Sequence, residues 1–252
     1  MGWQLLRQGA ALLIRDWRSA LRVSVGPFLI LIAISLWALP ALGRAITTGL
    51  PPEQLQGGAG AARLLILQIV HLLGSFAVLA WIAVAWHRSV LLGEQPSLLP
   101  TPPRHLVRRY LGRFLLIALA PALIVLASLA SVVLLVPAHG SSFPWASLAP
   151  ILAYLLSVHV LLRLGVALPG TALARPLPLR DAWCVTGRHK GTLWALTGAM
   201  ALLGVVNNLL GQATSWPGIA FSQVIAWATL MLGLSLLTAL YGTLVEGRSL
   251  PS

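Results

Sequence analysis

Six long apolar runs restrict the fold of this chain more than any other feature of its sequence. They lie near residues 23–42, 64–86, 114–136, 147–169, 191–210 and 220–244. A helix of about 20 apolar residues crosses the hydrocarbon core of a bilayer, so each run is long enough to span a membrane. Because backbone groups find no water partner in lipid, only helices and closed β-barrels can span it. The alternating apolar and polar pattern of a barrel is absent from the sequence, so we predict an all-α, polytopic membrane protein.

Charged residues are too few to cover a water-facing surface. Of the 252 residues, 9% are charged and 58% are hydrophobic, whereas soluble domains carry about 25% charged residues. The fifth run is the weakest, because Asn207 and Asn208 lie near its end. Segments rich in Pro, Gly and polar residues, such as GLPPEQLQGGAGAAR and PAHGSSFPWAS, separate the runs and are typical of loops. We therefore expect a single integral membrane domain over residues 1–252.

The net charge of +12 indicates an anionic partner. Nucleic acid is not expected, because the arginines lie beside apolar runs and no basic stripe with interleaved aromatic residues is present in the sequence. Membrane lipids with anionic headgroups are the expected partners, and another membrane protein is a further candidate. Cys184 is the single cysteine of the sequence, which excludes an internal disulfide and a multi-cysteine metal site.

Basic residues are divided unevenly between the two sides of the predicted bundle. Fourteen Lys or Arg residues lie before the first run, after the second and fourth runs, or in the C-terminal tail. Only Arg44 and Arg63 flank the first loop on the other side, and Arg163 lies inside the fourth run. Cytoplasmic segments carry the excess of Lys and Arg, so both termini are expected in the cytoplasm. The first run exceeds the 7–15 residues of a signal peptide core, which favours an uncleaved span in a bacterial inner membrane.

The stretch before the first run has the pattern of an interfacial amphipathic helix over residues 1–22. On a helical wheel, one side holds Gln4, Arg7, Gln8, Arg15, Arg18, Ser19 and Arg22, and the opposite side holds Trp3, Leu6, Leu13, Trp17 and Leu21. This separation is typical of helices that lie in the headgroup plane, with packing on other protein as the alternative. PPRHLVRRYLGR and LPLRDAWCVTGRHKG begin near proline in a similar way. We therefore expect three hairpins, each preceded by an elbow helix on the cytoplasmic side.

The carboxylates argue against catalysis within the membrane. Of the five, Asp16, Glu53, Glu94 and Asp181 lie in elbows or loops, and Glu246 lies at the inner end of the last run. Proton relays and coupled transporters usually keep an acidic residue at mid-membrane. The sequence also contains no GxxxxGK[ST], HExxH or GxSxG pattern. We therefore expect a non-catalytic protein with no cofactor and no metal ion.

Two histidines and one arginine lie inside the predicted spans. His71 and His159 could ligate a haem iron, but the rise of a helix places them at depths about 7 Å apart. Hydrogen bonds to facing helices are the favoured interpretation of both residues. Arg163 follows His159 by one helical turn, so the two share a face. An arginine inside a span marks a candidate functional site, and snorkelling to the inner headgroups is the alternative.

The segment AWHRSVLLGE, residues 85–94, marks the exit of the second run from the membrane. We interpret Trp86 as an interfacial anchor, His87 and Arg88 as headgroup contacts, and Glu94 as the partner of a loop arginine.

One anion-binding site is predicted from the basic residues of the inner side. Arg88 and Arg163 would bind one phosphate or lipid headgroup, with Arg108, Arg109 and His159 as further candidates. The expected function is non-catalytic and acts through lipid or protein contacts, for example as an accessory or assembly factor. The alternative is a small transporter or a lipid or anion carrier that uses Arg163 and His159.

Four motifs resemble those of a known family. They are AWHRSVLLGE after the second run, RLGVALPG at 163–170, LRDAWCVTGRHKG at 179–191 and LYGTLVEGR at 240–248. With them the chain resembles a family of uncharacterised six-helix inner-membrane proteins of alphaproteobacteria, over nearly its whole length. The third motif is also similar to the elbows of membrane domains attached to glycerophosphodiester phosphodiesterases. The resemblance implies a fold and a location, and it implies no reaction because no catalytic domain is attached.

Overall fold

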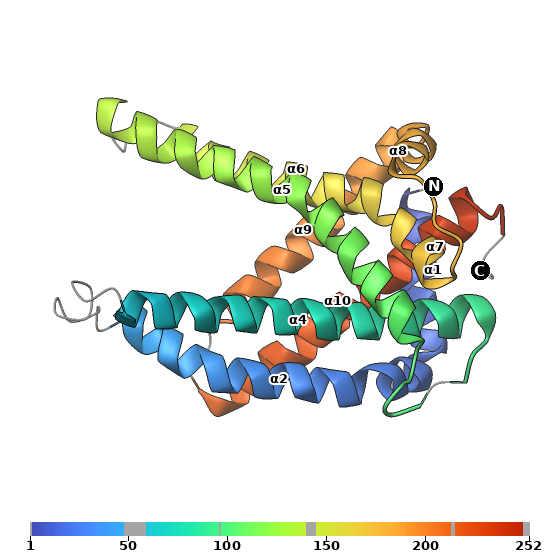
Figure 1. Cartoon of the computed structure of the whole chain (residues 1–252). Helices are drawn as coiled ribbons and strands as arrows, with labels where there is room; N and C mark the ends of the chain where they lie inside the picture. Colours follow the sequence, from blue (N-terminus) through green and yellow to red (C-terminus); the bar gives the residue numbers. More distant parts are fainter. Residues whose placement is uncertain (1, 48–58, 96, 140–144, 213–214, 249–252) are drawn as a thin grey trace.

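The computed structural model is a bundle of long helices (Figure 1). It describes residues 2–47, 59–95, 97–139, 145–212 and 215–248, and no strand occurs among these residues. The helices are α1 (Gly2–Arg15), α2 (Trp17–Thr47), α4 (Ala59–Leu92), α5 (Arg104–His139), α6 (Trp145–Gly165), α7 (Ala167–Ala172), α8 (Leu179–Gly187), α9 (Lys190–Leu210) and α10 (Trp216–Leu244). The prediction of an all-α polytopic membrane protein is confirmed, because six candidate spans lie in α2, α4, α5, α6–α7, α9 and α10.

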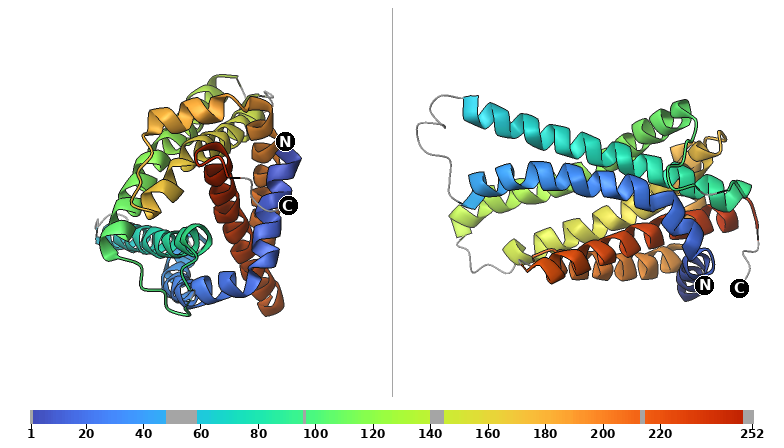
Figure 2. Two further views of the ribbon diagram at one scale, coloured as in Figure 1. Left: turned by 90° about the vertical axis from the view of Figure 1, so that its right-hand side faces the viewer. Right: turned by 90° about the horizontal axis from the view of Figure 1, so that it is seen from below.

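The six spans are arranged as three antiparallel hairpins. α2 packs against α4, α5 against α6, and α9 against α10. Both termini, α1, α8 and the segment between α4 and α5 lie at one end of the bundle, which we call the terminal end (Figure 1). Figure 2 shows α1 and α8 running across the direction of the long helices at this end. The arrangement of hairpins therefore agrees with the sequence prediction.

The helix predicted over residues 1–22 is interrupted at Asp16. α1 ends at Arg15 and α2 begins at Trp17. Helical hydrogen bonds still flank the junction, because the Asp16 amide donates to the Leu12 carbonyl at 3.0 Å and the Asp16 carbonyl accepts from the Ala20 amide at 2.9 Å. Leu5, Gly9 and Leu12 of α1 are buried, and α1 packs on α10 and α9. The side of α1 that holds these three residues is therefore covered by the protein itself. On the predicted apolar side, Leu6 and Leu13 are half-buried and Trp17 is exposed, so its contact with the headgroup plane stays a prediction. The chain turns at Asp16 because α2 has to follow the bundle while α1 crosses its end.

The second predicted elbow is not a separate helix, and this part of the prediction is wrong. Residues 104–113 continue without a break into α5, which extends over 36 residues. No proline or charged break separates the basic segment from the apolar one, so the helix continues. α5 instead bends along its length (Figure 1), as expected for a helix with Pro121 in its interior. The first and third elbows are separate helices, α1 and α8.

The fourth span consists of two helices. α6 ends at Gly165 and α7 begins at Ala167, with Val166 between them. Pro169 lacks an amide proton for the Gly165 carbonyl, and its ring crowds that carbonyl, so a regular helix cannot continue through this turn. All six residues of α7 are buried, and α7 packs against α4, α5 and α10. The broken span therefore places a short helix in the centre of the terminal end.

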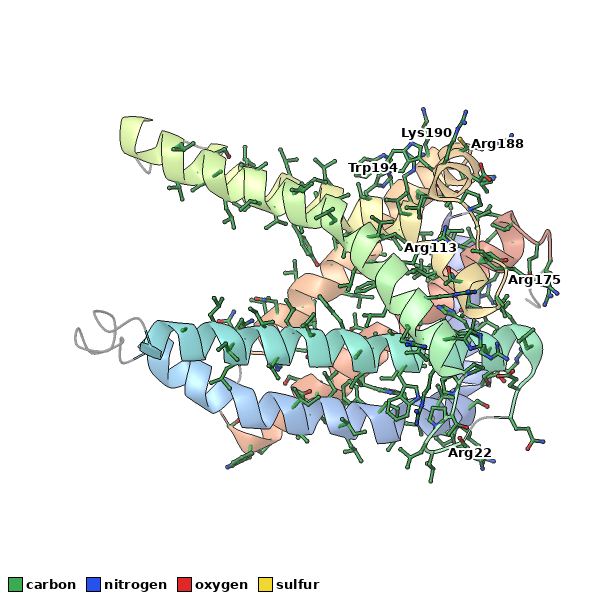
Figure 3. All side chains as sticks on the ribbon, viewed as in Figure 1. Arg22, Arg113, Arg175, Arg188, Lys190 and Trp194 are labelled. Carbon is green, nitrogen blue, oxygen red and sulfur yellow. The ribbon has the colours of Figure 1, made fainter. Side chains whose placement is uncertain are left out.

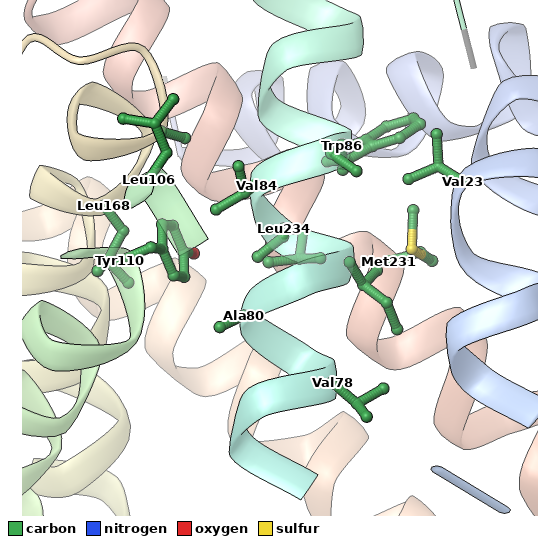
Figure 4. Close-up of a cluster of buried hydrophobic side chains, with 14 of the residues drawn as sticks. Val23, Val78, Ala80, Val84, Trp86, Leu106, Tyr110, Leu168, Met231 and Leu234 are labelled. Carbon is green, nitrogen blue, oxygen red and sulfur yellow. The ribbon is translucent and has the colours of Figure 1, made fainter. Parts of the chain in front are cut away.

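The core lies in the half of the bundle nearest the terminal end. On α4, residues 82–87 are all buried, whereas Leu65, Ile66 and Ile69 near its other end are exposed. Figure 4 shows the Trp86 side chain directed toward Val23 of α2, and Tyr110 of α5 beside Leu168 of α7. Exposed leucines and isoleucines on the outer parts of the spans are suited to lipid contact, because a membrane replaces water there.

Candidate functional site

Exposed basic side chains are concentrated at the terminal end of the bundle. Figure 3 shows four of them there, Arg22, Arg175, Arg188 and Lys190. Twelve basic residues with exposed side chains belong to this end: Arg7, Arg15, Arg18, Arg22, Arg104, Arg108, Arg109, Arg175, Arg180, Arg188, Lys190 and Arg248. A cluster of this size attracts anions through its summed field as well as through single contacts.

Three carboxylates at the same end are already paired with arginines. Asp16 contacts Arg15 at 3.4 Å, Glu246 contacts Arg248 at 2.9 Å, and Glu94 forms an ion pair with Arg88. Of these arginines, only Arg15 and Arg248 belong to the exposed cluster, so these ion pairs neutralise two of its twelve charges. The remaining exposed arginines make no ion pair within the described ranges. A large positive charge is therefore left for partners outside the chain.

Trp86 and His87 lie inside the core, which corrects their interpretation as interfacial residues. Both are 0% exposed. α4 continues to Leu92, so the last apolar turn before the charged residues is surrounded by α2, α5, α7 and α10 rather than by headgroups. The hydropathy of the sequence decreases at Trp86, but the helix and its neighbours extend further.

His87 links three helices through its two ring nitrogens. Nδ1 lies 2.8 Å from Thr238 Oγ1 of α10, and Nε2 lies 3.3 Å from the Tyr110 hydroxyl of α5. The Thr238 hydroxyl donates its proton to the Leu234 carbonyl at 2.8 Å, so its oxygen accepts from Nδ1–H. In this network the neutral imidazole carries its proton on Nδ1, and Nε2 accepts from the Tyr110 hydroxyl. The arrangement is a satisfied structural network with no access for a substrate.

Arg88 is neutralised within the protein. Its Nε donates to Glu94 Oε2 at 2.9 Å, and its Nη2 donates to Glu94 Oε1 in a bidentate ion pair. Its Nη1 donates to the Ala172 carbonyl at the end of α7, at 3.2 Å. The pairing of Glu94 with an arginine of this region is therefore confirmed. All three nitrogens are occupied, so Arg88 fastens the end of α4 to α7.

Arg163 lies near the end of α6 and is directed at α8. Its Nη2 donates to the Trp183 carbonyl at 2.7 Å, and its Nε donates to Thr186 Oγ1 at 3.3 Å. Its guanidinium carbon lies 3.5 Å from the centroid of the Trp183 ring, which is close for a cation–π contact. A Cβ at Gly187 would lie 2.9 Å from Nη2, so this glycine leaves room for the guanidinium.

His159 is directed at α9, one turn before Arg163. Its Nδ1 lies 3.1 Å from Thr197 Oγ1, and its ring stacks on Trp194 with centroids 4.1 Å apart and 13° between the planes. The Thr197 hydroxyl donates to the Leu193 carbonyl at 2.8 Å, so it accepts from the histidine. The predicted hydrogen bond of His159 to a facing helix is confirmed.

The two arginines proposed to share one phosphate have separate partners. Arg88 and Arg163 contact no common residue, and α4 packs against α7 rather than α6. The fourth span turns at Val166, so its two parts face different neighbours. Arg108 and Arg109 are exposed on α5 and make no recorded contact with either guanidinium. The structure therefore brings Arg163 and His159 together on one face and leaves the other three candidates elsewhere.

His71 and His159 have different surroundings. The buried Nδ1 of His71 in α4 has no hydrogen-bond partner among the described residues, so its predicted bond to a facing helix is not observed. His159 of α6, in contrast, hydrogen-bonds Thr197 and stacks on Trp194, both of α9. No group of three or more His, Cys, Asp or Glu residues within the described ranges could hold a metal ion.

Several residues that contact Arg163 or His159 were not predicted from the sequence. Trp183 and Thr186 of α8, and Trp194 and Thr197 of α9, supply the partners of Arg163 and His159. The spacing of Trp183 to Thr186 and of Trp194 to Thr197 places each pair on one helix face, which was a detectable signal. What the sequence could not show is that both faces turn toward α6.

The face shared by α6, α8 and α9 offers hydrogen-bond donors and aromatic rings but no carboxylate contact to Arg163. Such a set can bind an anion or a headgroup, and it provides no nucleophile with an adjacent base.

No protein-family model, no curated protein and no solved structure matches this chain.

Proposed function

We propose that the protein is a non-catalytic integral membrane protein that acts by binding anionic lipid at its terminal end, as an accessory or assembly factor for lipid or protein partners. The observation that supports this function is the concentration of twelve exposed basic side chains at one end of a helical bundle with six candidate spans. Each Lys or Arg near an anionic surface contributes roughly 1 kcal/mol of attraction.

The same distribution supports a location and an orientation. Because Lys and Arg collect on the cytoplasmic side of membrane proteins, our proposal is that the terminal end and both termini lie in the cytoplasm. The bacterial inner membrane, and membership of the alphaproteobacterial six-helix family, follow from the sequence motifs as part of this proposal. In this setting the basic end would face the anionic inner leaflet.

Lipid enrichment tests the function directly. The protein is reconstituted in nanodiscs containing phosphatidylcholine and a minor fraction of phosphatidylglycerol, and co-purified lipid is quantified by mass spectrometry. We expect phosphatidylglycerol to be enriched, and the enrichment to decrease when Arg104, Arg108 and Arg109 are replaced together by Gln and when salt is added, because surface attraction is screened. Replacement of the same three residues by Lys keeps the charge and is the matched control. Equal enrichment in the Gln and Lys variants at all salt concentrations would contradict the proposal.

A second candidate function is that of a small transporter or a lipid or anion carrier using Arg163 and His159. The interruption between α6 and α7 at Val166 is the observation that favours it, because interrupted spans are frequent in transporters, although Val166 itself keeps helical backbone angles of φ −56° and ψ −23°. Uptake of radiolabelled phosphate into proteoliposomes, compared between the wild type and Arg163→Gln, tests this alternative. Uptake no faster than in protein-free liposomes would exclude phosphate transport.

A further inference from the structure

Arg163 differs from Arg88 in that its charge has no carboxylate partner among the described residues. Both arginines are half-buried near the inner end of a span, but Glu94 neutralises Arg88 while the partners of Arg163 are a carbonyl, a hydroxyl and an indole ring. An unpaired charge within a span is costly, and ionisable residues at such positions mark sites for ions or ligands. An anion bound here would contribute the missing negative charge.

The guanidinium of Arg163 is held in a fixed position by α8. Two of its three nitrogens are occupied by Trp183 and Thr186, and the Trp183 ring covers one of its faces. Its Nη1 has no hydrogen-bond partner among the described residues, so two N–H groups remain for a ligand. Because the side chain is already ordered, binding an anion there costs little conformational entropy.

One indole ring contacts Arg163 and a second contacts His159, one helical turn away on the same face. Trp183 is 41% exposed and Trp194 is 47% exposed, although both rings already make contacts inside the protein. Arg188 directly follows α8 and Lys190 is the first residue of α9; both are exposed, and Figure 3 shows them in the same region as Trp194. Half-exposed tryptophans are typical of the headgroup level of a bilayer, where the ring contacts acyl chains and the N–H contacts polar groups.

We propose that Arg163, Trp183, His159 and Trp194 form a discrete site for one anionic phospholipid of the inner leaflet, whose phosphate is bound by Arg163. The Trp194 ring, held by its stack on His159, lines the path of the acyl chains one helical turn deeper in the membrane. Arg188 and Lys190 face the outer edge of the headgroup. This inference rests on the proposed function and assigns to it one specific lipid site.

Titration of the whole protein with single lipids tests the site. The protein in detergent is titrated with phosphatidylglycerol, and the affinity of the first bound lipid is measured by native mass spectrometry. We expect Arg163→Lys to weaken this first binding event about tenfold, because a point charge cannot reproduce the fixed fork of donors. Trp216→Leu, a change at an exposed position where α10 begins, away from the terminal end, should leave it unchanged.

A second variant separates binding from the attachment of α8. Trp194→Leu removes no residue that hydrogen-bonds or stacks on Arg163. It should also weaken the first binding event, because the indole ring that would contact the acyl chains is lost. Unchanged first-lipid affinity in both Arg163→Lys and Trp194→Leu would overturn the site. Displacement of the lipid by an excess of inorganic phosphate would overturn it as well, because the ligand would then be a free anion.

Failure of the site and failure of the proposed function give different results. If the wild type enriches phosphatidylglycerol in nanodiscs but Arg163→Lys retains the first lipid as tightly, only the discrete site is wrong. If the wild type shows no enrichment at all, the proposed function itself is wrong. Enrichment that persists while the first binding event weakens in both variants supports both proposals.

Discussion

Buried polar side chains determine which helices meet in this protein. In the core, the His87 ring joins α4 to α10 and α5, and the Trp227 indole donates to Ser24 Oγ at 2.7 Å, which joins α10 to α2. Apolar side chains alone distinguish poorly between helices that could equally contact lipid. Hydrogen bonds of this kind therefore contribute to the specificity of the bundle as well as to its stability.

Thr238 is the residue at which this network can be tested. Thr238→Val keeps the side-chain shape but removes the acceptor of His87 Nδ1–H, which would remain buried without a partner. We expect a decrease of about 1–3 kcal/mol in the free energy of unfolding, measured by steric trapping or denaturant titration in micelles. Thr238→Ser keeps the hydroxyl and should cost clearly less than Val. Equal stability of the Val variant and the wild type would show that the hydrogen bond is dispensable.

The residue-level predictions were correct where they depended on local spacing. His159 and Arg163 lie on one helix face, as their separation of four residues requires. Trp86 and His87 were misplaced because a decrease in hydropathy was taken for the end of the buried region. The partner of His87 is Thr238, 151 residues away, and no local pattern indicates a contact of this kind.

Among the elements, α7 is the one most closely enclosed by its neighbours. Its Gly170 carbonyl accepts from the Arg175 amide at 2.8 Å, and the following residues turn back over the helix. A Cβ at Gly170 would lie 2.6 Å from the Arg175 carbonyl oxygen and 3.0 Å from Tyr241 Cε2. Glycine is therefore required here by the close approach of backbone atoms.

Gly170→Ala should destabilise the protein, because neither the Arg175 carbonyl nor the Tyr241 ring can move without disturbing its own contacts. We expect a loss of about 1–3 kcal/mol in the free energy of unfolding. Gly191→Ala in α9 is the matched control, because a Cβ there meets no atom within 4 Å. The control should be neutral or stabilising by up to about 1 kcal/mol through helix propensity. Thermal unfolding in detergent compares the two, and an equal effect of both substitutions would contradict the close packing of α7.

The six spans were predictable because each needs only length and hydropathy, which are local properties. The elbows were less predictable, since a basic segment before a span can form its own helix, as α8 does, or extend the span, as in α5. The first elbow is divided between α1 and α2 at Asp16, although no proline or glycine marks the position. The direction of these helices depends on packing against distant segments, and sequence patterns do not contain that information.

For the whole molecule, the basic residues favour one orientation in the membrane. Exposed arginines and Lys190 gather at the terminal end. An excess of basic residues on one side directs that side to the cytoplasm during insertion. The orientation proposed above therefore predicts which loops are accessible from outside the cell.

Labelling of single cysteines tests this orientation. Cys184 is exposed and is first replaced by Ser to give a cysteine-free protein. In that background, Ser215→Cys, at the opposite end from the termini, should react with a membrane-impermeant maleimide in intact spheroplasts. Ser97→Cys, between α4 and α5, should react only after the membrane is permeabilised. The reverse pattern would place the termini outside and contradict the orientation.

The packing of α1 on α10 also has a consequence for the order in which the protein is made. α1 is synthesised before α10, and its buried residues Leu5 and Gly9 pack on that helix. Since synthesis proceeds at roughly 5–20 residues per second, α1 waits for at least ~10 seconds before α10 exists. During this interval its apolar side has no protein partner, and the surface of the membrane is the nearest apolar medium. The contact between α1 and α10 therefore forms late in assembly, and a nascent chain lacking α10 leaves α1 available to chaperones and proteases.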